Sequence, residues 1–212
     1  MGSSSRPALE WYFQQSLPTS GRFDMVTIAK QTVRLAGLEL IRFSNTTGEE
    51  TQDQNATVHF FEADDKFDQV WNMPESSVAK LAQYRQMMSP DFSLWSDMPV
   101  TLQFLNTVRN RWCGAFWQSK GLTVIPTVSW SDGRSFDFCF SGIEQGSTVA
   151  VSTLGCQDRR EDFMRGYRHM ARAIQPEAVV CYAEPFAEMR ELCPVVAVPY
   201  APNTRIARRL AG

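Results

Sequence analysis

The chain has 212 residues, of which 43% are hydrophobic and 21% are charged. This length suits one globular domain with a short appendage, and the composition excludes a disordered or fibrous main body. The 21 Lys and Arg residues stand against 23 Asp and Glu residues, which excludes a protein that coats nucleic acid by uniform positive charge.

The first 55 residues are predicted to form an arm and a short β-rich entry. Residues 1–22 contain Ser, Gln and Pro and are interrupted by the apolar pair Trp11 and Tyr12, and no apolar core of a signal peptide occurs in them. No stretch of 18 apolar residues follows anywhere, so we expect a cytoplasmic protein without a membrane segment. Residues 24–34 and 38–43 have the Val, Ile and Phe content of strands, and the polar residues 44–55 are expected to form an exposed loop.

Residues 56–212 are predicted to form a single α/β domain. Six short apolar runs alternate with helical patterns: Thr57–Phe61, Met87–Phe92, Thr123–Ser129, Thr148–Ser152, Val179–Tyr182 and Val195–Val198. Runs that are apolar nearly throughout indicate a mostly parallel sheet of about six strands with helices on both faces. Two architectures remain open, an open doubly wound sheet and an incomplete barrel. In both, the runs at 123–129, 148–152 and 179–182 are expected to be adjacent and parallel.

Two long helices are predicted between these runs. The first spans 99–119, with Asp97 as its expected cap, Pro99 in its first turn and Gly121 after its end. The second spans 160–174. The apolar residues at helical spacing predict the buried stripes, Leu102, Leu105, Val108, Trp112 and Phe116 in the first helix and Phe163, Tyr167, Met170 and Ile174 in the second.

Several familiar kinds of site are absent from the sequence. The five cysteines have no C-x-x-C pair, so we expect reduced thiols in the core and no disulfide framework or zinc knuckle. Two histidines give little support to a metal site or a Ser-His-Asp triad. No P-loop, no G-x-G-x-x-G and no G-x-S-x-G sequence occurs. These absences argue against a P-loop NTPase, a dinucleotide-binding dehydrogenase and a typical α/β hydrolase.

Polar residues lie at the ends of the predicted strands or directly after them, where parallel α/β folds place their ligands. They are Glu62, Asp64 and Asp65, then Asp91, Ser93 and Asp97, then Trp130, Ser131 and Asp132, then Ser152 and Thr153, and finally Glu184. Carboxylates that converge there suit a Mg²⁺ ion or a general acid/base pair. Asp91 lies between Pro90 and Phe92, where there is no helix to cap, which favours a functional role for it.

The first long helix carries Asn106, Arg109, Asn110 and Cys113 on one face. Arginine near tryptophan can bind phosphate or stack on bases, but an ordinary solvated face is the alternative. Residues 159–212 contain nine arginines against six acidic residues, which hints at a polyanionic partner such as nucleic acid.

The amino-acid sequences of several segments resemble those of a known family. These are HFFEADDKFDQVWNMPE at 59–75, MSPDFSLWSDMP at 88–99, NTVRNRWCGAFWQSKGLTVIPTVSWSD at 106–132, SFDFCFSGI at 135–143, VAVSTLG at 149–155 and RGYRHM at 165–170. Together they resemble the family called domain of unknown function 4417. The resemblance implies an origin in a phage or mobile element and no particular activity. It implies these motif positions: Asp91, Ser93, Asp97, Asn106, Arg109, Trp117, Gln118, Trp130, Asp137, Ser152 and Tyr182.

The residue pattern and the resemblance together give the candidate site. We expect Asp91, Asp97, Asp137 and Ser152 to be catalytic, and Asn106, Arg109, Gln118, Trp130 and Tyr182 to bind substrate. The favoured hypothesis is an enzyme that acts on a nucleotide or nucleic-acid-type substrate, with a divalent cation such as Mg²⁺ as a candidate cofactor. The alternative is a non-catalytic protein that binds a host or phage macromolecule, which six tryptophans would suit. A third hypothesis is direct stacking of Trp and Arg on single-stranded nucleic acid.

Overall fold

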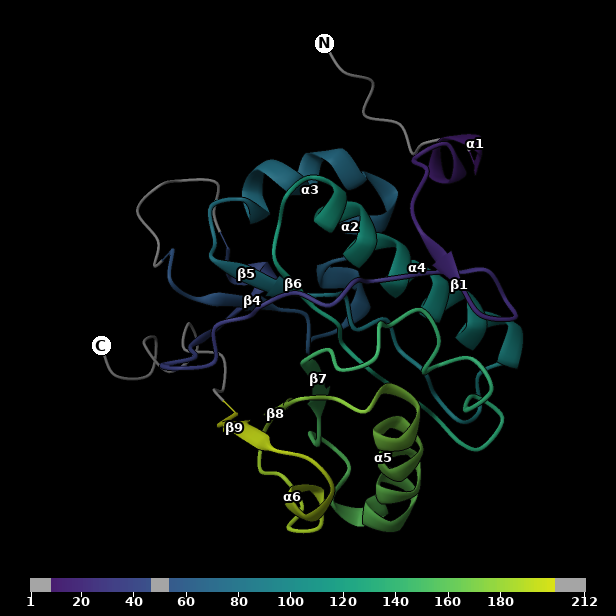
Figure 1. Cartoon of the computed structure of the whole chain (residues 1–212), viewed down its shortest axis with the longest axis vertical. Helices are drawn as coiled ribbons and strands as arrows, with labels where there is room; N and C mark the ends of the chain where they lie inside the picture. The colour runs from purple at the N-terminus through teal and green to yellow at the C-terminus, as the bar shows by residue number, and fades with distance from the viewer. Residues whose placement is uncertain (1–8, 47–53, 201–212) are drawn as a thin grey trace.

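The computed structural model describes residues 9–46 and 54–200 (Figure 1). Residues 1–8 of the predicted arm at 1–22 and residues 47–53 of the predicted loop at 44–55 lie outside the described residues. So do three of the nine arginines counted in residues 159–212, namely Arg205, Arg208 and Arg209. The helices are α1 (Leu9–Phe13), α2 (Gln69–Asn72), α3 (Pro74–Leu81), α4 (Val100–Ser119), α5 (Arg160–Ile174) and α6 (Met189–Leu192), with short 3-10 turns η1 (Phe43–Asn45), η2 (Asp64–Lys66) and η3 (Gln157–Arg159). The strands are β1 (Thr19–Ser20), β2 (Met25–Val26), β3 (Leu40–Arg42), β4 (Thr57–His59), β5 (Gln86–Met88), β6 (Val124–Ile125), β7 (Val149–Ser152), β8 (Val179–Tyr182) and β9 (Val195–Val198).

Parallel strands form two sheets, with the orders β3-β4-β5-β6 and β7-β8-β9. The parallel α/β class is therefore confirmed, and each of the six apolar runs contains a strand. The prediction of a single sheet of about six strands was wrong. The described residues form parallel sheets of four and three strands, and β1 and β2 add a small antiparallel ribbon. Of residues 24–34, only Met25–Val26 are in a strand.

Pro126 explains why the sheet divides between β6 and β7. Because proline has no backbone N–H, it cannot continue the pairing of β6 with β5, and β6 ends at Ile125. The chain then turns to the next strand: Ala150 N donates to Pro126 O at 2.8 Å, and Val128 N donates to Ala150 O at 2.8 Å. One parallel bridge between Thr127 and Ala150 therefore joins the two sheets. The runs at 123–129, 148–152 and 179–182 are thus neighbours in this order and parallel, as expected.

Side chains alternate between the two faces of each sheet. Val58, Met87 and Val124 of the first sheet pack with Trp112 and Phe116 of α4, and the second sheet packs in the same way under α5. The other faces share an interior cluster made of Phe61, Met88, Ile125, Ala150, Val180 and Tyr182. Figure 1 shows α2, α3 and α4 beyond the first sheet and α5 and α6 beyond the second. The prediction of one sheet with helices on both faces was therefore wrong. Helices cover only one face of each sheet, because strand side chains fill the space between the two sheets.

Strand order favours the incomplete barrel over the doubly wound sheet. The order follows the chain from β3 to β9, with no reversal that would create the switch point of a doubly wound fold. The two sheets share an interior cluster, as barrel strands do. Within residues 9–46 and 54–200, β9 does not pair with β3, so the ring of strands stays open.

The buried stripe predicted for α4 was wrong at its first turns. Leu102 and Leu105 are 49% and 46% exposed, whereas Trp112 and Phe116 are buried as predicted. The first half of α4 buries polar residues in their place: Gln103, Asn106, Thr107, Asn110 and Arg111. This half of the helix lies on loops whose backbone carbonyls need donors, so polar side chains face inward there. Asp97 makes no capping bond to the start of α4, which also corrects its expected role.

The stripe predicted for α5 is confirmed. Phe163, Tyr167, Met170 and Ile174 are all buried against the second sheet. Among the helices of the described ranges, none combines the length and apolar character that crossing a bilayer requires.

Candidate active site

A cleft of about 890 Å³ lies at the carboxyl ends of β5, β6 and β7. Its lining comes from the segments after these strands and from the start of α5: Asp91, Leu94, Trp95, Ser96 and Asp97, then Val128, Ser129, Trp130, Ser131 and Asp132, then Ser152, Gly155 and Cys156, then Arg159, Asp162 and Phe163. Because parallel strands end at the same edge, side chains from three strands meet in one hollow. Four of the nine candidate residues line it: Asp91, Asp97, Ser152 and Trp130.

Asp91 is the titratable group whose setting in the cleft is most unusual. It follows β5 by three residues, and its carboxylate accepts a hydrogen bond from the Ser129 hydroxyl. Burial raises the pKa of Asp91 to about 6, and the neighbouring Asp64 carboxylate adds to the rise, although the Ser129 bond opposes it. A carboxyl with a pKa near neutrality can both give and take a proton at physiological pH, as general acid/base catalysis requires.

Asp64 supports the segment that carries Asp91. It lies in η2 after β4, and its carboxylate accepts hydrogen bonds from the Ser93 backbone N–H at 3.2 Å and from the Ser93 hydroxyl at 2.9 Å. The sequence placed Asp64 among the polar residues at strand ends, but it was not chosen as a candidate, and neither was Ser129. The one sequence feature that could have identified Asp64 and Ser129 is their position after neighbouring strands.

The cleft also presents aromatic faces. Trp130 packs against Phe163, with ring centroids 4.9 Å apart, and Trp95 is 63% exposed. Gly166 of α5 lies under Trp130: a Cβ at Gly166 would be 2.2 Å from the indole Nε1. The absence of a side chain at Gly166 therefore sets how close the Trp130 ring lies to the helix.

Substituting Gly166→Ala is expected to lower the free energy of unfolding by at least about 1 kcal/mol, because the added methyl group overpacks Trp130. By helix propensity alone the change would stabilise the protein by about 1 kcal/mol. Urea denaturation and tryptophan fluorescence measure the two effects, with Ala173→Gly at an exposed position of α5 as the propensity control. A more stable Gly166→Ala protein with unchanged fluorescence would contradict the packing role.

Three buried amides of α4 hold the segment that carries Asp91. Gln103 Nε2 donates to the backbone oxygens of Trp95 at 3.0 Å and Met98 at 2.8 Å. Asn106 Nδ2 donates to Ser93 O at 2.8 Å, and Asn110 Nδ2 donates to Pro90 O at 2.6 Å. These bonds replace the backbone partners that an irregular segment lacks, so the polar side of α4 fixes one wall of the cleft.

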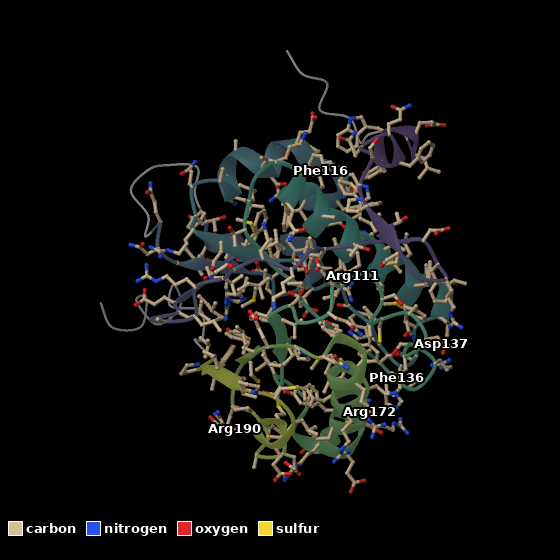
Figure 2. All side chains as sticks on the ribbon, in the orientation of Figure 1. Arg111, Phe116, Phe136, Asp137, Arg172 and Arg190 are labelled. Carbon is tan, nitrogen blue, oxygen red and sulfur yellow. The ribbon has the colours of Figure 1, made fainter. Side chains whose placement is uncertain are left out.

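Arg111 joins this wall to the next one. Its guanidinium donates to three backbone oxygens, Ser141 O at 2.9 Å, Thr127 O at 3.0 Å and Cys139 O at 2.6 Å. The residue is 2% exposed and lies near the centre of the molecule (Figure 2). Burial lowers the pKa of Arg111 to about 10, so it stays a cation at neutral pH. No carboxylate of the described residues forms an ion pair with it, and carbonyl dipoles stabilise its charge instead.

Three other candidate residues lie outside the cleft lining. Asp137 is at the outer edge of the molecule, where it pairs with Arg22 at 3.4 Å (Figure 2). Gln118 clamps the backbone of Ala29, accepting from its N–H at 2.8 Å and donating to its oxygen at 2.8 Å. Tyr182 is in the interior cluster and stacks on Phe61, with centroids 5.3 Å apart.

Asn106 and Arg109 lie behind the cleft wall. Arg109 forms an ion pair with Asp68, lies 3.9 Å from the ring centroid of Phe92, and donates to Asn106 Oδ1 at 3.2 Å. Both side chains are therefore engaged within the protein, and neither is among the residues that line the cleft.

The expected core cysteines are present. All five cysteines are free, and four of them are buried. Cys156 lines the cleft, where burial raises its pKa and disfavours a reactive thiolate. No three His, Cys, Asp or Glu side chains of the described ranges are grouped so as to hold a metal ion. A Mg²⁺ ion that is held by one or two carboxylates and by substrate phosphates would not need such a group.

Comparison with known proteins assigns the family. The model of the family described as Domain of unknown function (DUF4417) matches residues 18–199. The chain belongs to this family. The match extends beyond the segments that carried the resemblance and includes β1 to β3 and β9. No solved structure matches the chain.

Two relatives of the chain are phage proteins. The chain is similar to the Gene 1 protein of Mycobacterium phage L5, with 42% identity over 130 residues, which are 60% of this chain and 57% of that protein. The Gene 1 protein of Mycobacterium phage D29 is 41% identical over 128 residues, 59% of this chain and 47% of that protein. The chain thus spans about half the length of the curated relatives it matches.

Proposed function

We propose that this protein is an enzyme that acts on a nucleotide or nucleic-acid-type substrate by general acid/base catalysis, with Asp91 as the residue that gives or takes the proton. One observation carries the proposal: a partly buried carboxyl with a pKa of about 6 lies in a cleft at the strand ends. In parallel α/β folds this edge is where catalytic groups gather. Ser129 and Asp64 tune the group, and Gln103, Asn106, Asn110 and Arg111 hold its surroundings in place.

The lining favours the base of such a substrate as the part that enters the cleft. Trp95 and Trp130 offer flat faces on which a base can stack. Among the described residues, Asp97, Asp132 and Asp162 line the cleft together with one cation, Arg159, and a phosphate would be repelled there unless a cation accompanied it. A divalent cation such as Mg²⁺ remains part of the proposal in this accompanying role.

The test compares wild type, Asp91→Asn and Asp137→Asn. Each is incubated with nucleosides, nucleotides and single-stranded oligonucleotides, with Mg²⁺ or with EDTA, and products are identified by liquid chromatography and mass spectrometry. We expect product from wild type and from Asp137→Asn, and a rate at least about 100-fold lower for Asp91→Asn. The rate of wild type is expected to inflect near pH 6. Equal rates for wild type and Asp91→Asn would contradict the proposal.

A non-catalytic binding protein is the second candidate, favoured by Trp95. A tryptophan that is 63% exposed at the mouth of a cleft is the kind of residue that dominates binding interfaces. This function would give no product from wild type in the assay above. It would also give tight binding of single-stranded DNA or RNA that Trp95→Ala weakens and Asp91→Asn leaves unchanged, measured by fluorescence anisotropy.

A further inference from the structure

A second, smaller hollow lies at the amino ends of β4 and β5, the opposite ends from the cleft. It has a volume of about 200 Å³, and Arg34, Asn55, Thr57, Arg85 and Gln86 are among its lining residues. Thr57 and Gln86 are the first residues of their strands, so the floor of the hollow is part of the first sheet.

The hollow is positively charged. Arg34 and Arg85 line it, and none of the lining residues within 9–46 and 54–200 is acidic. The ion pairs of the described residues join seven other cations to carboxylates, and neither Arg34 nor Arg85 takes part in them. Two guanidinium groups that share a hollow of this size repel one another unless an anion lies between them.

Hydrogen bonds to neighbouring residues hold the backbone of both arginines at the hollow. The Gln86 side chain, on a residue that is 1% exposed, accepts from Arg34 N at 2.9 Å and donates to Arg34 O at 2.9 Å. Arg85 N donates to Gln54 O at 2.9 Å, and its guanidinium donates to Asn55 Oδ1. The backbone at both positions is thus fixed before any ligand arrives, which lowers the entropy cost of binding.

We propose that this hollow binds a phosphate group. Arginine forks present paired N–H donors that match phosphate oxygens, and phosphate is a stronger acceptor of such bonds than a neutral ligand. Thr57 Oγ1 accepts from Gln86 Nε2 at 3.0 Å, which leaves its hydroxyl proton to donate to the same anion. This proposal does not depend on the proposed function, because the two hollows lie at opposite ends of the strands.

Isothermal titration with inorganic phosphate at low ionic strength tests the site. We expect one phosphate per wild-type chain, about tenfold weaker binding for Arg34→Gln or Arg85→Gln, and none for the double variant. Arg172→Gln, at an exposed position of α5, is the charge-matched control and is expected to bind as wild type does. Asp91→Asn is also expected to bind phosphate normally, so loss of catalysis and loss of this site are distinguishable.

Two further arms identify the source of the phosphate. Binding of AMP, or of an oligonucleotide with a 5′-phosphate but not of the same oligonucleotide without it, would place a nucleotide group there. No phosphate binding by wild type, or equal binding by wild type and the double variant, would overturn the proposal.

Discussion

Asp91→Asn is expected to raise the free energy of unfolding at pH 8 by about 1–3 kcal/mol, although it removes the group proposed for catalysis. Burial raises the pKa of Asp91 from 3.8 to about 6. Keeping it ionised in the folded state therefore costs up to about 3 kcal/mol at high pH. Asparagine has no charge to bury, and its Oδ1 can still accept the bond from Ser129.

The pH dependence fixes the sign of this effect. Because the folded state binds the Asp91 proton more tightly than the unfolded state, the cost is complete above pH 6 and disappears as the pH falls below 3.8. Urea denaturation at several pH values should therefore show a gain for Asp91→Asn at pH 8 that shrinks towards pH 4. Asp97→Asn, also in the cleft lining, is the matched control. A loss of stability of the same size at both pH values would contradict the account.

Arg111→Met is expected to lower the free energy of unfolding by about 3–5 kcal/mol. The substitution keeps a long apolar side chain, but it leaves the backbone oxygens of Cys139 and Ser141 without their side-chain donor. Thr127 O then keeps only the bond from Asn110 Nδ2 at 3.2 Å. Arg111→Lys keeps the charge but loses the planar fork that reaches three oxygens at once, so we expect an intermediate loss.

Chemical denaturation measures this loss, with Arg190→Met as the control. Arg190 is exposed and donates to one backbone oxygen, Val195 O at 3.0 Å, so its replacement is expected to cost about 1 kcal/mol or less. An effect for Arg111→Met no larger than that of the control would show that the carbonyl contacts contribute little to stability.

The fold could be predicted where the sequence pattern reports burial directly. Runs such as Val179–Tyr182 are apolar throughout because both faces of a parallel strand are covered, and they are strands in the structure. The division into two sheets was not visible in the same way, since it depends on Pro126 and on which neighbour the next residues join. Pro126 was recognised as awkward for a central strand, but the partner that Thr127 meets is a tertiary fact.

The polar side of α4 shows a second limit of sequence patterns. Gln103, Asn106 and Asn110 have the composition of a solvated face, and Leu102 and Leu105 have that of a buried one. In the structure the three amides are buried and the two leucines are exposed. The reason is that the first half of α4 packs on loops, whose backbone carbonyls need hydrogen-bond donors. Nothing in one sequence tells a helical face against loops from a helical face against water.

The candidate site was found best where strand topology alone decides position. Asp91 and Trp130 follow strands, Ser152 is the last residue of one, and the carboxyl ends of these strands meet at one cleft. Asp137 and Tyr182 were chosen because they belong to the family's sequence motifs, which do not say where a side chain lies. Asp137 is at the outer edge of the molecule, and Tyr182 is in the interior cluster. Asp64 and Ser129 act through Asp91, and such second partners are visible only when distances are known.

The most direct test of the central claim is a carbon NMR titration of the Asp91 side-chain carboxyl in the wild-type protein, assigned by its loss in Asp91→Asn. The account predicts a midpoint near pH 6, and a lower midpoint in Asp64→Asn, where the neighbouring charge is gone. A midpoint near 3.8, the value of an ordinary aspartate, would show that Asp91 is a solvated carboxylate and would contradict its role in proton transfer.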